Sequence, residues 1–238
     1  MLGWLFQQPH LRSSLAAGSE MKPNTALALM LLAFAALIRS LNKPPPLLRS
    51  LGHACAAATA LVGVLTLIEY LANLNLGIDE FLFKDVPNAI GTSYPGRMSA
   101  PTAWSFLLGA GSVFLLDFET RKGLRPSQWL ALLLAAIPAE ILVCYVYVNM
   151  NVLAFGPRAS YMAVPTAGAL VAISLGLLAC APESGIMRPL TIQNQAGRMF
   201  RRLLVSLLLL PVVLGWSALL NPQVRWNSFL PVCSITAA

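Results

Sequence analysis

The sequence predicts an all-α integral membrane protein with six transmembrane helices, arranged as three parallel helical-hairpin repeats. Of its 238 residues, 57% are hydrophobic and only 11% are charged, and the mean hydropathy is +0.70. A soluble fold of this composition would leave large apolar areas in water. In addition, one phrase opens three apolar runs: a Met, three residues that include proline, then Thr-Ala, at 21–26, 98–103 and 162–167. A spacing kept three times indicates a repeated unit.

Six apolar stretches approach or exceed the roughly 18 residues that a helix needs to span a bilayer. A charge at the centre of a span costs about 2.5 to 3.5 kcal/mol on insertion, and charges fall almost wholly between these stretches. Glu69 and Glu140 are the exceptions. The predicted spans are 23–38, 51–74, 100–116, 129–148, 163–180 and 203–220.

Each repeat is predicted to hold a helix opened by the Met-x-x-x-Thr-Ala phrase, a short basic turn, a second helix and a polar loop. Proline in a first helical turn costs no intrahelical hydrogen bond, and a nearby Thr or Asn can cap free amides. The phrase is therefore interpreted first as a helix start, with a binding role for its three threonines as the alternative. The predicted segments are an extracytoplasmic N-terminal segment 1–22, hairpins 23–97, 98–161 and 162–220, and an extracytoplasmic tail 221–238.

Basic residues predict the orientation. They concentrate in the turns inside the hairpins, whereas the basic residues on the opposite side are spread over longer segments and diluted by acids. The positive-inside rule places the turns in the cytoplasm and both termini in the periplasm of a bacterial inner membrane. The third turn is basic with interspersed apolar residues, which favours contact with anionic lipid or a docked partner. Its basic residues are Arg188, Arg198, Arg201 and Arg202.

Motifs for catalysis are missing from the sequence. It has no phosphate-cradling glycine loop, no His-Glu-x-x-His and no Gly-x-Ser-x-Gly. We therefore expect no enzymatic activity, no metal site and no nucleic-acid partner. His53 is a weak candidate for a single axial ligand of a haem or pigment, although an interfacial histidine at a helix start is the simpler interpretation. The sequence requires no cofactor, and lipid is the molecule most simply expected to be bound.

The two glutamates inside the predicted spans are the strongest functional candidates. Intramembrane carboxylates are costly and usually face the protein interior, where they pair, bind an ion or move protons. We expect this of Glu69, with Tyr70 beside it, and of Glu140; packing by a protonated or hydrogen-bonded side chain is the alternative. The longest connection is predicted to form an outer surface, in the headgroup zone or over a ligand site, from Asp79, Glu80, Phe81, Phe83 and Arg97.

Several phrases in order resemble the N-terminal multi-pass membrane region of certain bacterial sensor histidine kinases and diguanylate cyclases, which PAS domains usually follow. The phrases are Met-Lys-Pro-Asn-Thr-Ala at 21–26, Leu-Ile-Glu-Tyr-Leu at 67–71, Pro-Gly-Arg-Met-Ser at 95–99 and Tyr-Met-Ala-Val-Pro-Thr-Ala at 161–167. The resemblance implies a signal-input module. In that family a further helix precedes the first repeat and another leads into the cytoplasmic effector, and both are missing or replaced here.

Two functions of different class are expected. The first is a non-catalytic input module that works through a separate signalling output protein. The second is an accessory transmembrane subunit packed against a larger photosynthetic or respiratory membrane complex, where a pigment is the implied companion. A small transporter is less favoured, because all three hairpins point the same way and only two acids lie in the spans.

Overall fold

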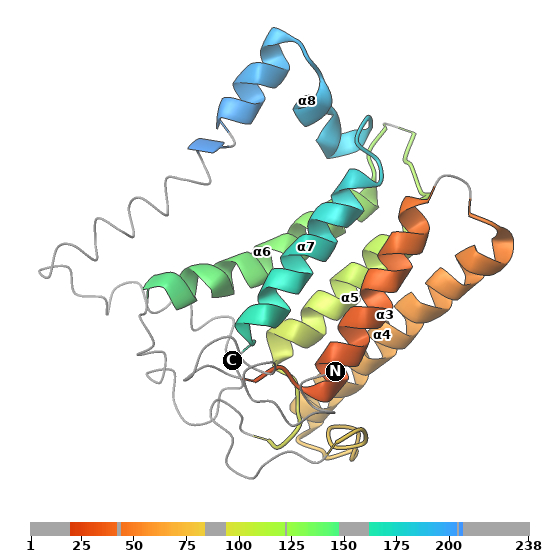
Figure 1. Cartoon of the computed structure of the whole chain (residues 1–238), viewed down its shortest axis with the longest axis vertical. Helices are drawn as coiled ribbons and strands as arrows, with labels where there is room; N and C mark the ends of the chain where they lie inside the picture. Colours follow the sequence, from red (N-terminus) through yellow and green to blue (C-terminus); the bar gives the residue numbers. More distant parts are fainter. Residues whose placement is uncertain are drawn as a thin grey trace, which may run out of the picture.

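The computed structural model describes residues 20–41, 44–83, 94–121, 123–147, 162–203 and 205–206, and all regular structure among them is helical. Five helices form a bundle, and short helical segments extend from one of its ends (Figure 1). The bundle helices are α3 (Pro23–Ser40), α4 (Pro46–Ala72), α5 (Ala100–Phe114), α6 (Pro126–Tyr147) and α7 (Val164–Ala179). A 3-10 turn at Gly185–Met187, α8 (Arg188–Thr191) and a helical stretch at 195–203 follow.

Three of these helices have the length and hydropathy of membrane spans. They are α3 with 18 residues, α4 with 27 and the 18-residue part Pro126–Val143 of α6, while α7 is a shorter apolar helix. The first five predicted stretches coincide with α3 to α7, although α4 begins earlier than predicted. It begins at Pro46 because proline is tolerated in the first turn of a helix. Most of the predicted sixth span, 203–220, lies outside the described residues.

The helices that open with the phrase lie at the centre of the bundle. Helices α3, α5 and α7 contact one another, α4 packs across α3 and α5, and α6 packs across α5 and α7. The core between them is filled by fully buried Leu32, Phe106, Leu134 and Leu170. At Gly63 a Cβ would lie 2.9 Å from the carbonyl oxygen of Ala103, so only glycine lets α4 approach α5 this closely.

The helix starts agree with only half of the prediction. Proline occupies the first or second position of α3, α5 and α7, as expected. Capping by Thr or Asn is wrong, because none of the three starts has a side-chain cap. The amide of Asn24 instead donates to the carbonyl oxygens of Ile78 and Asp79, at 2.7 and 3.1 Å. It ties α3 to the loop after α4.

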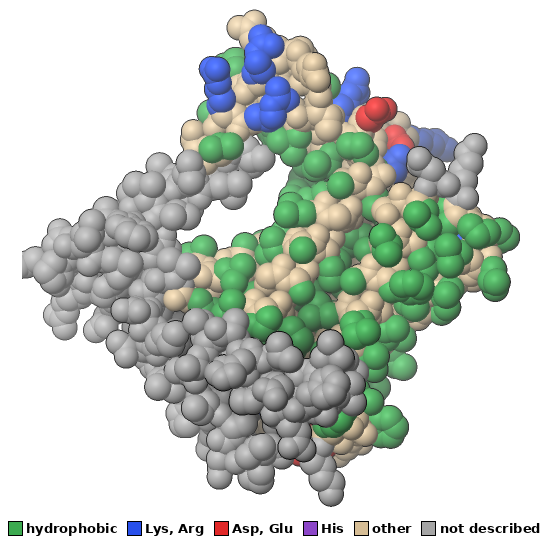
Figure 2. Space-filling view, viewed as in Figure 1, with side chains coloured by type: hydrophobic (Ala, Val, Ile, Leu, Met, Phe, Trp, Pro, Cys, Tyr) green, Lys and Arg blue, Asp and Glu red, His purple; other side chains and the backbone are tan. Residues whose placement is uncertain are grey.

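At the opposite end, the turns are joined by ion pairs near the surface. We call this end, which carries α8, the basic end; Figure 2 shows Lys and Arg side chains gathered there. Asp117 pairs with both Arg39 and Arg49. Partial burial raises the pKa of Asp117, but hydrogen bonds from the two arginines and their charges outweigh it and hold the pKa below its usual range. These pairs link the end of α3 and the start of α4 to the turn that follows α5.

Candidate functional site at the convergence of three helix starts

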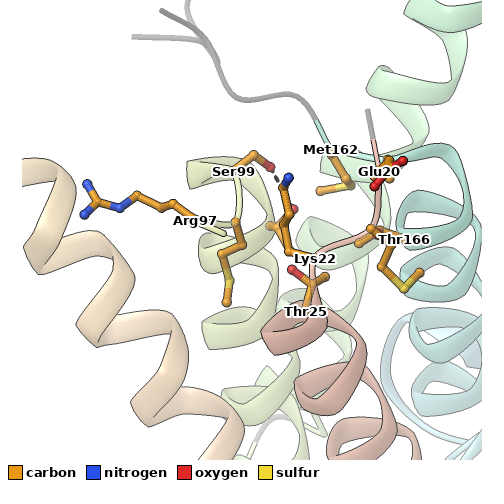
Figure 3. Close-up of a pocket in the computed structure, with 11 residues that line it drawn as sticks. Glu20, Lys22, Thr25, Arg97, Ser99, Met162 and Thr166 are labelled. Atoms are coloured by element: carbon orange, nitrogen blue, oxygen red, sulfur yellow. Dashed lines mark hydrogen bonds between the residues drawn. The ribbon is translucent and has the colours of Figure 1, made fainter. Parts of the chain in front are cut away.

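The three Met-x-x-x-Thr phrases meet at one small cavity. Each contributes a methionine, the following residue and a threonine, and Glu20 and Arg97 complete the lining (Figure 3). The cavity volume is about 10 Å³, which is close to the least space that holds one water molecule. We call the end of the bundle that contains it the cavity end. Its lining is Glu20, Met21, Lys22, Thr25, Arg97, Met98, Ser99, Thr102, Met162, Ala163 and Thr166.

The positive ends of three helices and one lysine face this cavity. Helices α3, α5 and α7 have no acidic residue in their first turns and no side-chain caps. Each helix start carries a partial charge of about +0.5 from its aligned peptide dipoles. Lys22 adds a full charge, although it is only 4% exposed, and its amine points toward Ser99 in Figure 3. Glu20, the one acid among the described residues of the lining, is half-buried.

Three threonine hydroxyls also line the cavity. Thr25, Thr102 and Thr166 are 3%, 2% and 1% exposed. Thr102 shares a hydrogen bond with Ser99 at 2.8 Å. Within the part of the chain that the structure describes, the hydroxyls of Thr25 and Thr166 have no hydrogen-bond partner. Buried hydroxyls are usually paired, so these two are available to a water molecule or a ligand.

A buried ion cluster adjoins the cavity. The side chain of Arg97 leaves the cavity rim toward α4 (Figure 3). Its Nε donates to Oδ2 of Asp79 at 2.8 Å and lies 3.5 Å from Oε2 of Glu69. Arg97, Asp79 and Glu69 are 2%, 6% and 0% exposed. One arginine therefore serves two carboxylates in a place where charges are costly unless paired.

Backbone and aromatic contacts fix this cluster in position. Arg97 also donates to the carbonyl oxygen of Leu74 at 3.0 Å, and its guanidinium lies 4.3 Å from the ring centroid of Tyr94. Oε1 of Glu69 accepts the Leu76 amide at 2.8 Å, whereas its buried Oε2 has no hydrogen bond. Gly96 has a φ of +71°, and a Cβ there would lie 2.5 Å from a carbonyl oxygen. Glycine is thus required immediately before Arg97.

The chain gives no match to any family model, curated protein or solved structure. The resemblance to sensor-type membrane regions therefore remains a prediction. Any function assigned to the chain has to rest on the geometry of the site and on the sequence.

The expected outer surface is wrong for two of its five residues. Asp79 and Arg97 are buried, because the loop after α4 folds back over the end of that helix and pairs them with each other and with Glu69. Phe81 is 84% exposed, Glu80 is exposed and Phe83 is half-buried. The sequence also indicated no cationic partner for Glu69, and Arg97 is that partner. Tyr70, predicted beside Glu69, donates to the carbonyl oxygen of Met98 at 3.0 Å.

The structure does not bring the other sequence candidates into this site. Glu140 is half-buried on α6 and, within the described ranges, makes no hydrogen bond or ion pair. The His53 ring stacks on Phe114 with a centroid distance of 5.7 Å. The four arginines of the third turn lie at the basic end, where Arg201 donates to the carbonyl oxygens of Leu190 and Ile192.

Sequence reasoning missed Lys22 as a site residue. Lys22 is the last residue of the predicted N-terminal segment 1–22, yet it follows the phrase methionine directly, at the place that Ser99 and Ala163 hold in the other two phrases. Residues at equivalent places in a repeat tend to meet when the repeated elements are parallel and adjacent. The position within the phrase, rather than the charge, was the signal that could have found it.

Proposed function

We propose that this chain is a non-catalytic signal-input module of a bacterial inner membrane, with its ligand site in the cavity between the starts of α3, α5 and α7. One observation carries the proposal: three segments far apart in the sequence line a cavity with a buried lysine and with two hydroxyls that have no partner among the described residues. A few convergent polar groups in a concave site are a feature of ligand-binding sites. The resemblance to the membrane regions of sensor kinases and diguanylate cyclases supports the same function.

The proposed topology has six spans in three parallel hairpins, with the cavity end in the periplasm and the basic end in the cytoplasm. The open face of α7 supports a sixth helix. The residue ten positions after the phrase threonine is Ala35 in α3 and Ser112 in α5, and both are fully buried. Ala35 lies near Gly52 of α4, and the Ser112 hydroxyl donates to the carbonyl oxygen of Ser127 in α6.

The equivalent residue of α7 is Gly176, where a Cβ would have nothing within 4 Å. In α3 and α5 this position faces the second helix of the same hairpin. The segment 203–220 is the corresponding helix of the third hairpin, and a small residue here suits close packing between membrane helices. We therefore place that segment against the open face of α7.

The central helices provide a physical route for the signal. Helices α3, α5 and α7 each begin at the cavity and extend toward the basic end, and they contact one another between these ends. A ligand that draws their starts together would change their relative tilt, and packed helices transmit such shifts as rigid elements. At the basic end, Arg188, Arg198 and Arg202 are exposed to anionic lipid or to a separate output protein.

An accessory subunit of a larger membrane complex is the second candidate. The observation that favours it is the same face of α7, where Gly168, Ala172 and Gly176 are exposed at four-residue spacing. A helix of a partner protein would fit there as well as a helix of the same chain. A pigment- or haem-bearing complex is the class of partner that this alternative implies.

Native purification in mild detergent, followed by mass spectrometry, separates the two functions. We expect recovery of the chain alone or together with a signalling output protein. Stoichiometric recovery with a pigment- or haem-bearing complex would contradict the input-module proposal and support the accessory subunit.

A further inference from the structure

We infer that the cavity at the cavity end binds one small monovalent anion, either a halide or the carboxylate group of a small organic acid. The inference rests on the proposed ligand site and names the chemical class of its ligand. It is carried by three properties of the cavity: the charge around it, the hydrogen-bonding groups that line it and its size.

The charge around the cavity selects an anion. Among the described residues, Lys22 and Glu20 are formally equal and opposite. Arg97, Glu69 and Asp79, in the cluster beside the cavity, together carry one formal negative charge. The three helix starts add about +0.5 each, or about +1.5 in total, so the surroundings stay net positive. A cation would meet repulsion from Lys22 and from all three helix starts. A single negative charge is the best match to this environment.

The lining offers hydrogen-bond donors. The hydroxyls of Thr25 and Thr166 have no partners among the described residues, and a hydroxyl turns its proton toward an anion at no structural cost. Figure 3 shows Thr25 on the side of the cavity nearest α3, with Lys22 above it. The first amides of an α-helix have no intrahelical acceptor, and no side chain caps them in α3, α5 or α7. An acceptor-only ligand satisfies all these donors together.

The size of the cavity favours a small anion. A volume of about 10 Å³ accommodates one water-sized group. A halide or one end of a carboxylate needs little expansion, which the flexible methionine side chains at the rim can supply. A tetrahedral phosphate or sulfate, with four oxygens and a higher charge, needs a larger expansion and matches the charge less well.

Chloride NMR line widths on the purified full-length chain test the inference, with acetate and sulfate as competitors at matched ionic strength. We expect chloride broadening that acetate removes and sulfate leaves in place. If the chloride line broadens and acetate does not reduce the broadening, the site binds halides alone. If acetate competes at a lower concentration than chloride, the site favours carboxylates. Competition by sulfate as strong as by acetate would overturn the assigned class.

Matched variants test whether the anion binds in this cavity. The near-isosteric pair Thr25→Val and Thr166→Val removes two donors, and we expect at least about a tenfold loss of anion affinity. Ser174→Ala is the control, because its hydroxyl is buried on α7 and bonds the Val171 carbonyl oxygen of its own helix. Lys22→Met should abolish specific binding, whereas Arg202→Met, which removes an exposed charge, should not.

If the chloride line broadens as much with the Thr25→Val and Thr166→Val variant as with the wild type, the inference is overturned. This holds even if Lys22→Met fails to fold. The result is separable from the test of the proposed function. Anion binding by a chain that purifies with a haem or pigment complex leaves the inference standing and removes the input module. A chain that purifies with a signalling partner but binds no anion overturns the inference and leaves the input-module proposal standing.

Discussion

The two ends of the bundle hold ion pairs in different surroundings. At the cavity end, Lys22, Arg97, Glu69 and Asp79 are all less than one tenth exposed. At the basic end, the side chains of Asp117, Arg49 and Glu119 are 53%, 50% and 44% exposed, and the one nearly buried cation of these pairs, Arg39 at 6%, faces the exposed Asp117. Exposed ion pairs contribute about 0 to 1 kcal/mol, while burying an ion costs several kcal/mol before pairing returns part of it. Stability alone does not explain the buried charges, which is the physical reason to place the function at the cavity end.

Removing the shared cation should have the largest effect. Arg97→Met leaves Glu69 and Asp79 buried without their partner, and we expect a loss of about 3–5 kcal/mol in the free energy of unfolding. Denaturant titration in detergent measures it. The matched control is Arg49→Met at the basic end, where about 0 to 1 kcal/mol is expected. Equal losses would remove the contrast between the two ends.

The two glutamates in the predicted spans provide a comparison between two sites of different burial. Glu69→Gln replaces a carboxylate beside Arg97 with a neutral amide and should cost about 1–3 kcal/mol. Glu140→Gln, at a half-buried site without partners among the described residues, should change stability by no more than about 0.5 kcal/mol. Denaturant unfolding curves of the two variants, recorded side by side, measure both changes in the free energy of unfolding. A larger effect at Glu140 would move the functional assignment to α6.

Acid should weaken the basic end in a defined direction. Because the pKa of Asp117 is lowered in the folded protein, its contribution is present above the unfolded value of 3.8 and disappears as the pH falls through the folded pKa. Asp117→Asn should therefore cost up to about 1 kcal/mol at neutral pH and nothing once wild-type Asp117 is protonated. Stability measured from neutral to acid pH tests this. A cost that persists at the acid limit would contradict the ion-pair explanation.

The proposed sixth helix gives the smallest energetic signal and a clear structural one. In a cysteine-free background, Gly176→Cys is combined in turn with single cysteines at 207–214, and a short cross-linker is added. We expect cross-links with a period near 3.6 residues, because only one face of a helix meets α7. Uniform cross-linking, or none, would favour a partner helix on that face.

Much of the helical layout could be predicted from the sequence, because apolar length and first-turn proline act locally. The ion cluster could not, since Glu69 and Arg97 are separated by a loop whose path depends on Gly96, Asn24 and the Tyr94 ring. The repeated phrase predicted three similar helix starts. These starts line one cavity because tertiary packing places the first helix of each hairpin at the centre of the bundle. No local sequence pattern encodes that packing.

Hydrogen–deuterium exchange with and without saturating acetate tests the central claim most directly, because it views both ends of the bundle in one experiment. We expect amides at the starts of α3, α5 and α7 to slow together, while those at 115–121 and 123–125 are unchanged. Slowing at a single helix start, or equal slowing at both ends, would contradict a ligand site at the convergence of the three phrases.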